Sequence, residues 1–380
     1  MRARAALVAA TALNLPFGTL YAFSVFLKPM EALLAIGRTQ MSVVFALATI
    51  TLTAGMVLAP SAYKRVSPWN IAFACGACSA AGLLLAASAT SYAQFAVGYG
   101  VVVGAGAGVG FILVQQAVNQ SVVERRGLAN GYVVSLYPLG AMVGAPILGW
   151  AIEAFGVRAA FAGLGGTVFL SCAICGVLLR AARVDVHDAS AEPRAPADAH
   201  WPLFMRLATV FFLAAAAGLM VMSQAAGVVQ AYGGQTAVAV GATTLIMAAV
   251  GSARIAGGWL TDRFAIPHVA MGAQVFSLAG AIALTASPSP VIAVIALSMI
   301  GVGYGIISGL TAAAIGRYWP KNAFGRVAGR LYIAWCLAAL TLPILAGWLY
   351  DRTAGYGVAV LIAGALNLAA VFVAARLPKP

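Results

Sequence analysis

The sequence predicts an all-α membrane protein with twelve transmembrane helices in two pseudo-symmetric six-helix bundles. The first observation is composition: of 380 residues, 63% are hydrophobic and 8% are charged, with a mean hydropathy of +0.97. No soluble core could hide that much apolar surface. The second observation is that the apolar residues form runs of roughly 20 to 27, and about 20 are enough to cross a bilayer. The third is an internal repeat.

The twelve apolar runs are separated by short loops that carry most of the charge. The first run follows Met1-Arg-Ala-Arg4, which has the charge order of a signal peptide. It continues to about Leu27 without a clear cleavage site, so a retained helix is expected. The expected helices cover residues 5–27, 40–63, 69–89, 92–117, 128–153, 158–182, 204–230, 239–262, 267–287, 290–315, 324–350 and 355–377.

One long polar stretch interrupts the apolar runs. Residues 183–202 are rich in acidic residues and contain three prolines, a composition typical of a flexible linker. We therefore expect an N-terminal six-helix bundle at 1–182, a cytoplasmic linker at 183–203 and a C-terminal six-helix bundle at 204–380.

The basic residues predict the orientation of the chain. Most of the 22 Lys and Arg residues fall in loops on the side of both termini and the linker, and four fall on the opposite side: Lys28, Arg38, Arg158 and Arg352. By the positive-inside rule, both termini are cytoplasmic in a multi-pass protein of the cell (inner) membrane. The net charge of +13 is spread over these loops instead of one solvated face, which argues against nucleic acid as a partner.

The two halves repeat each other at an offset of about 198 residues. Gly127-Leu-Ala-Asn-Gly131 aligns with Gly325-Arg-Val-Ala-Gly329, and Pro146-Ile-Leu-Gly-Trp150 aligns with Pro343-Ile-Leu-Ala-Gly-Trp348. Parallel repeats of this kind, with a site between them near the bilayer midplane, are the plan of one large class of secondary transporter.

A loop motif adds a family resemblance. It is best kept in the second half as Gly258-Trp-Leu-Thr-Asp262-Arg263, and in the first half it has decayed to Ala59-Pro-Ser-Ala-Tyr63-Lys64. With the repeats, these residues resemble the major facilitator superfamily over the whole chain. The resemblance implies the major facilitator fold, a transporter and not an enzyme, and a cytoplasmic gating motif formed by Gly258, Asp262 and Arg263.

Within that superfamily, the chain is similar to the oxalate/formate antiporter-like and monocarboxylate porter branch. The residues that carry the similarity are Leu20-Tyr-Ala-Phe-Ser-Val-Phe-Leu-Lys-Pro29 and Leu331-Tyr-Ile-Ala-Trp335. The resemblance implies that Arg254, in the eighth helix, holds a substrate carboxylate. The second cation of the dicarboxylate members is replaced by Trp335, which favours a monocarboxylate. The acidic residue and the lysine of the eukaryotic porters are replaced by Val250 and Tyr21.

The physical chemistry of Arg254 agrees with that role. A guanidinium stays protonated, and at a helix centre it costs about 2.5 to 3.5 kcal/mol unless it faces water or an anion. Its fork of donors can bind a carboxylate through two hydrogen bonds. The alternative is that Arg254 extends about one helical turn towards the cytoplasmic boundary and is only structural.

Six further side chains lie near the middle of expected helices. Phenols, indoles and amides at such depth seek hydrogen-bond partners and would suit an organic acid with an apolar or aromatic body. The alternative for each is ordinary helix packing. These candidate substrate-binding residues are Tyr21, Tyr137, Gln224, Tyr304, Tyr332 and Trp335.

The cysteines do not predict a cofactor. Cys75 and Cys78 form one C-x-x-C pair and Cys172 and Cys175 another, but both lie in apolar helices without charged or imidazole neighbours. We interpret them as packing residues and expect no metal and no cofactor.

The expected partners are a small organic anion and the lipid bilayer, and the protein is expected to be monomeric. All nine acidic residues fall in loops or near helix ends, so transport by anion exchange, or by proton-linked symport in which the substrate carries the proton, needs no acidic group inside the membrane. Two alternatives remain: an exporter of amphipathic drugs or other small molecules with Arg254 structural, and a non-transporting membrane sensor or membrane enzyme.

Overall fold

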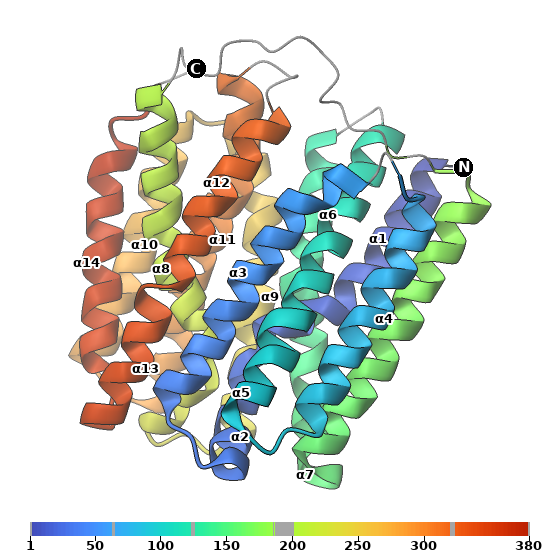
Figure 1. Ribbon diagram of the computed structural model, residues 1–380. Helices are drawn as coiled ribbons and strands as arrows, with labels where there is room; N and C mark the ends of the chain where they lie inside the picture. The colour runs from blue at the N-terminus through green and yellow to red at the C-terminus, as the bar shows by residue number, and fades with distance from the viewer. Residues whose placement is uncertain are drawn as a thin grey trace. The chain divides into compact units, whose positions relative to one another are not determined.

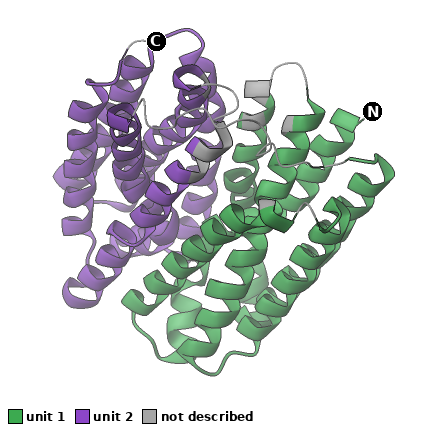
Figure 2. Ribbon diagram, turned by 45° about the horizontal axis from the view of Figure 1, so that its top comes forward, with its two compact units in different colours: residues 1–190 green, residues 191–380 purple. Residues whose placement is uncertain are grey.

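The computed structural model describes residues 2–62, 65–122, 126–184, 186, 201–319 and 324–378. Every regular element within these residues is a helix (Figure 1). The chain divides into two compact units, unit 1 at 1–190 and unit 2 at 191–380 (Figure 2). Most of the expected linker, residues 183–203, and the loop residues Tyr63, Lys64 and Arg125 lie outside the described residues.

Unit 1 begins with one long helical stretch, Arg2–Leu34, that changes its winding along the way. Its middle section is a 3-10 helix, in which Ala22 leaves the helical dihedral range with φ −91° and ψ 17°. The stretch ends where Ala35 adopts the left-handed conformation. The elements of unit 1 are α1 (Arg2–Phe17), η1 (Gly18–Phe26), α2 (Leu27–Leu34), α3 (Arg38–Ala62), α4 (Pro68–Ala87), α5 (Tyr92–Phe95), η2 (Ala96–Val103), α6 (Gly104–Ser121) and α7 (Arg126–Ala181).

The segment η2 is a π-helix that leads directly into the glycine-rich start of α6. A π-helix shifts the backbone ladder by one residue and usually occurs as a local feature of an α-helix. Here the hydroxyl of Thr51, on α3, donates a hydrogen bond of 2.7 Å to the carbonyl oxygen of Gly100. The neighbouring helix therefore provides a partner for a backbone group in the irregular segment.

The helix α7 supplies two membrane spans. It has 56 residues, which at 1.5 Å per residue would extend about 84 Å, far more than a hydrocarbon core of about 30 Å. Gly156 divides it with φ 82° and ψ 162°, a conformation open to glycine because it has no Cβ. Eleven described stretches are long and apolar enough to span a membrane, and the stretch Gly131–Ala181 covers most of two expected runs, 128–153 and 158–182. The prediction of twelve spanning helices is thereby confirmed.

Unit 2 repeats the plan with fewer interruptions. Its last-but-one span breaks at Thr341, which has φ −102° and ψ −103°, and Pro343 then lies in the first turn of the next helix, where its missing N–H costs nothing. The elements of unit 2 are α8 (Trp201–Ala231), α9 (Thr236–Thr261), α10 (Ile266–Ala286), α11 (Pro290–Tyr318), α12 (Phe324–Ala339), α13 (Leu342–Thr353) and α14 (Gly357–Ala374).

Candidate functional site

Arg254 lies on α9 and is buried, with 3% of its surface exposed. Its guanidinium carbon sits 5.5 Å from the centroid of the Tyr304 ring, within the range of a cation–π contact. Nη2 also donates to the Tyr304 hydroxyl at 3.4 Å, which is long for a hydrogen bond. The charged group therefore points into unit 2, against the midpoint of α11.

Tyr304 connects Arg254 to a third helix. The indole Nε1 of Trp335, on α12, donates a hydrogen bond of 2.6 Å to the Tyr304 hydroxyl. Tyr332, one turn before Trp335, packs edge-on against it with ring centroids 6.1 Å apart. We call Arg254, Tyr304, Tyr332 and Trp335 the arginine–aromatic cluster. Four of the seven substrate-binding residues expected from the sequence thus come together within one unit.

Glycines allow the helices around this cluster to approach closely. A methyl group added at Gly309, on α11, would lie 2.1 Å from the carbonyl oxygen of Arg254. One added at Gly257, on α9, would lie 2.3 Å from the carbonyl oxygen of Ile306, and one at Gly218, on α8, 2.3 Å from Cγ of Tyr304. Small residues at such positions let membrane helices pack backbone to backbone. These three glycines help to hold Arg254 against Tyr304, a role that no sequence pattern indicated.

We expect Gly309→Ala to destabilise unit 2 and to weaken substrate binding together. The new methyl group would meet a backbone oxygen that cannot rotate away, and over-packing typically costs 1–3 kcal/mol. The measurement is the thermal midpoint of the purified protein, alongside uptake in proteoliposomes. Gly241→Ala, on α9, is the matched control because nothing lies within 4 Å of the added atom. Equal midpoints for the two variants would contradict the proposed close packing.

Tyr21 and Tyr137 contact each other in unit 1. Their ring centroids are 5.5 Å apart in an edge-on arrangement, and Phe111 packs on Tyr137 at 5.3 Å. The Tyr137 hydroxyl donates to the carbonyl oxygen of Ala107 at 3.2 Å. Tyr21 belongs to the 3-10 segment η1, so its place depends on a change of winding that the apolar pattern does not reveal.

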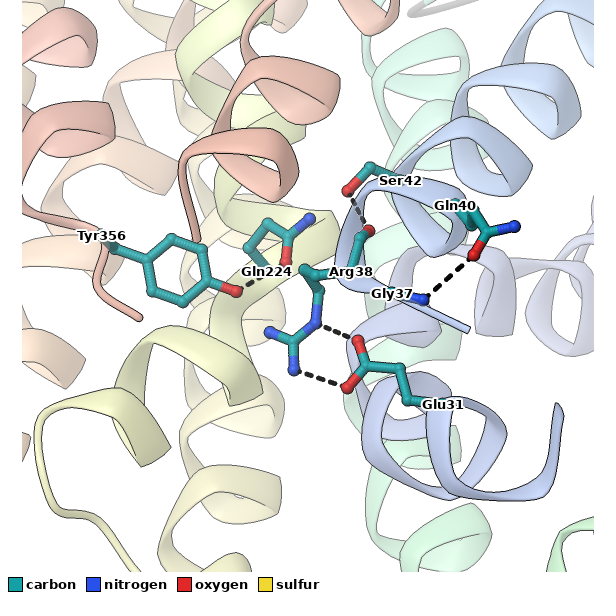
Figure 3. Close-up of polar contacts among 7 residues, drawn as sticks. All are labelled: Glu31, Gly37, Arg38, Gln40, Ser42, Gln224 and Tyr356. Atoms are coloured by element: carbon teal, nitrogen blue, oxygen red, sulfur yellow. Dashed lines mark hydrogen bonds and ion pairs between the residues drawn. The ribbon is translucent and has the colours of Figure 1, made fainter. Parts of the chain in front are cut away.

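Gln224 makes its polar contact with another part of unit 2. Its Oε1 accepts a hydrogen bond of 2.9 Å from the hydroxyl of Tyr356, which precedes the first turn of α14 (Figure 3). Tyr356 in turn stacks on Tyr350 with centroids 4.9 Å apart. The amide is fully buried, as expected from the sequence, and this phenol is one of its partners.

Among the described residues, two arginines are buried, Arg254 and Arg38, and Arg38 lies near a helix boundary, as expected from the sequence. Arg38, the first residue of α3, is 2% exposed. Its Nε and Nη2 both donate to the carboxylate of Glu31 on α2, the second at 3.0 Å (Figure 3). Both residues fall between the first two expected helices, and their opposite charges seven residues apart were the available signal for this pair.

The expected gating motif lies at the end of α9. Asp262, the C-cap residue, pairs with Arg317 of α11 at 3.6 Å. The guanidinium of Arg263 stacks on the Trp259 ring with its carbon 4.1 Å from the centroid. Gly258 packs closely against α11: a methyl group added at Gly309 would lie 3.1 Å from the backbone nitrogen of Gly258. The motif therefore ties the ends of α9 and α11 together.

The cysteine pairs lie where two helices of unit 1 cross. A methyl group added at Gly76 would be 2.6 Å from Cβ of Cys172, so α4 and α7 pack closely there, and the thiols are free. Within the residues that the structure describes, no group of three or more His, Cys, Asp or Glu residues could hold a metal ion.

Comparison with solved structures supports the fold. The D-xylose–proton symporter aligns over 100% of this chain and 99% of its own, with a TM-score of 0.78 and 14% sequence identity. At that identity, the likeness concerns the fold alone. A partially occluded inward-open xylose transporter from Escherichia coli aligns over 100% and 98%, with a TM-score of 0.77 and 13% identity.

Sequence relatives give the family. An uncharacterized MFS-type transporter of Escherichia coli K12, YhjX, is 23% identical over 85% of this chain and 82% of its own. Monocarboxylate transporter 11 of mouse is 28% identical over 80% and 71%, and monocarboxylate transporter 13 of rat is 26% identical over 96% and 86%. The model of the Major Facilitator Superfamily matches residues 7–339 and, in an overlapping match, 207–380. The chain is therefore a transporter that belongs to the major facilitator superfamily.

Proposed function

We propose that the chain is a secondary active transporter that moves a small organic monocarboxylate across the inner membrane by alternating access. The observation that carries the proposal is the burial of Arg254 against Tyr304 inside a helical unit of a membrane transporter. A fixed cation at that depth is stabilised by an anionic ligand. The relatives named monocarboxylate transporters support a carboxylate as that ligand.

The arginine–aromatic cluster can supply both the charge and the shape for such a substrate. The Arg254 guanidinium offers a fork of N–H donors to the carboxylate. The Tyr304 oxygen accepts a hydrogen bond from Trp335 and a long one from Arg254, and we propose that its O–H donates to the substrate carboxylate. Tyr332 and Trp335 offer ring faces to the organic body. Tyr21, Tyr137 and Gln224 remain proposed lining residues.

The positions of the acidic side chains bear on how transport of the substrate is coupled to a second ion. Among the described residues, Glu31 and Asp262 are engaged with arginines near helix ends, and Glu153 and Asp351 also lie close to the ends of their spans. We propose anion exchange or a symport in which the proton travels with the substrate carboxylate. We further propose that the protein works as a monomer with both termini cytoplasmic, and that Gly258, Asp262 and Arg263 gate its cytoplasmic side.

The test is an uptake panel in proteoliposomes. The purified chain is reconstituted and supplied with radiolabelled small monocarboxylates, dicarboxylates, and neutral or cationic amphiphiles. We expect saturable uptake of at least one monocarboxylate and weaker uptake of the dicarboxylates, because the cluster contains one fixed cation, Arg254. Uptake of neutral or cationic amphiphiles alone would contradict the proposal and favour a drug exporter in which Arg254 is structural.

We expect Tyr304→Phe to lower apparent substrate affinity about tenfold, because a hydrogen bond from the hydroxyl to a charged carboxylate contributes about 1.5–3 kcal/mol. The ring remains, but the Trp335 N–H loses its 2.6 Å partner and the substrate loses a donor. The measurement is the concentration dependence of uptake. Tyr318→Phe is the matched control because that hydroxyl donates to Pro378 at a helix end. An unchanged affinity in Tyr304→Phe would show that the hydroxyl has no role in binding.

A further inference from the structure

A groove of about 540 Å³ lies on unit 2 where the end of α9 meets α10 and α11. Its walls are apolar apart from one imidazole, and they include Leu260, Phe264, Phe276, Val302 and Ile306. Phe264 and Phe276 are 56% and 43% exposed. In a multi-pass membrane protein, an exposed apolar surface of this kind is suited to contact with the acyl chains of the bilayer.

The groove follows one face of α10. His268, Gly272 and Phe276 all line it, and their spacing of four residues places them above one another on the helix. From His268 to Phe276 the face extends about 12 Å along the helix axis. Nothing lies within 4 Å of a methyl group added at Gly272, so the middle of the groove is open.

An arginine adjoins the wall of the groove just before the start of α10. Arg263 adjoins the wall residue Phe264, and its guanidinium lies 4.1 Å from the centroid of the half-exposed Trp259 ring. Asp262 is engaged by Arg317 at 3.6 Å, so these two charges offset each other and Arg263 supplies the net charge. The side chain of His268 lines the groove at the same end of α10.

We propose that this groove binds an anionic phospholipid, with an acyl chain along the α10 face and the phosphate beside Arg263 and His268. An apolar channel with a cation at one end complements an amphiphile that has a negative head. A tryptophan beside the arginine is typical of the headgroup level of a membrane. Basic pockets between transmembrane helices bind anionic headgroups, and each nearby Lys or Arg favours the anionic lipid about fivefold.

The test measures retained lipid and does not depend on transport. The full chain is purified in a mild detergent and equilibrated with phosphatidylglycerol and phosphatidylcholine of identical acyl chains. Bound lipid is then counted by native mass spectrometry. Gly272→Leu fills the open middle of the groove, and Arg263→Gln removes the cation. Gly166→Leu, at an exposed glycine of α7 with nothing within 4 Å, is the matched control.

We expect the wild type and Gly166→Leu to retain phosphatidylglycerol about fivefold more than phosphatidylcholine. Gly272→Leu should lose the retained lipid, and Arg263→Gln should keep lipid but lose the preference. Equal retention of the two lipids by the wild type would overturn the proposal by showing an unselective lipid shell. Retention of phosphatidylglycerol by Gly272→Leu at the wild-type level would overturn it by placing the lipid elsewhere.

Discussion

Arg254→Ala is expected to reduce carboxylate uptake by the reconstituted protein roughly 10- to 100-fold at limiting substrate. A hydrogen bond to a charged group contributes about 1.5–3 kcal/mol, and the variant removes the cation that makes it. Arg254→Lys should also be impaired, because an ammonium keeps the charge but loses the planar fork. The measurement is initial uptake at several concentrations, normalised to reconstituted protein.

A substitution on another face of the same helix controls for damage to α9. Ser252→Ala changes an exposed residue two positions away and should transport like the wild type. Full transport by Arg254→Lys would show that the positive charge alone binds the substrate carboxylate, and that two hydrogen bonds from a planar guanidinium are not required. If Arg254→Ala transports the acid as well as Ser252→Ala does, Arg254 does not bind the substrate.

Glu31→Ala is expected to destabilise the protein by about 3–5 kcal/mol, because it leaves a buried guanidinium without its carboxylate. The Arg38 side chain is 1% exposed, and two of its nitrogens donate to Glu31. Solvent cannot replace the lost partner at that burial. The measurement is the free energy of unfolding of unit 1, obtained by denaturant titration of the full chain in detergent micelles.

Three further variants make the stability result specific. Glu153→Ala removes an exposed carboxylate near the end of a span and should change stability little. Glu31→Gln keeps an oxygen that can accept one N–H and should lose less than Glu31→Ala. Replacing both partners, by Glu31→Gln with Arg38→Met, should restore much of the stability. Wild-type stability in Glu31→Ala would mean that the pair does not hold α2 to α3.

The spanning helices were predictable because the thickness of the bilayer requires a minimum number of consecutive apolar residues, and such runs can be recognised directly in the sequence. The burial of Arg254 and Tyr304 was predictable for the same reason, since both lie far from the polar ends of their runs. Their contact with each other could not be predicted from the sequence. It depends on glycines such as Gly309. Only the structure shows that a methyl group at Gly309 would lie 2.1 Å from the backbone carbonyl oxygen of Arg254.

Other features could not be read from apolar periodicity. The 3-10 winding that carries Tyr21 and the π-helix before Gly104 leave the hydropathy of their runs unchanged. Arg38 was expected in an outer loop because arginine usually marks a boundary. Its burial depends on the chain reversing at Ala35, a left-handed residue with φ 52°, so that α2 and α3 bring the two side chains together.

The most direct test of carboxylate binding by Arg254 compares one acid with its own primary amide. The two ligands have nearly the same shape, and only the acid carries a negative charge. For an acid transported by the wild type, we expect it to compete with labelled substrate at least tenfold better than the amide does, and we expect Arg254→Lys to lose most of that difference. Equal competition by acid and amide at the wild-type protein would contradict a carboxylate held by Arg254.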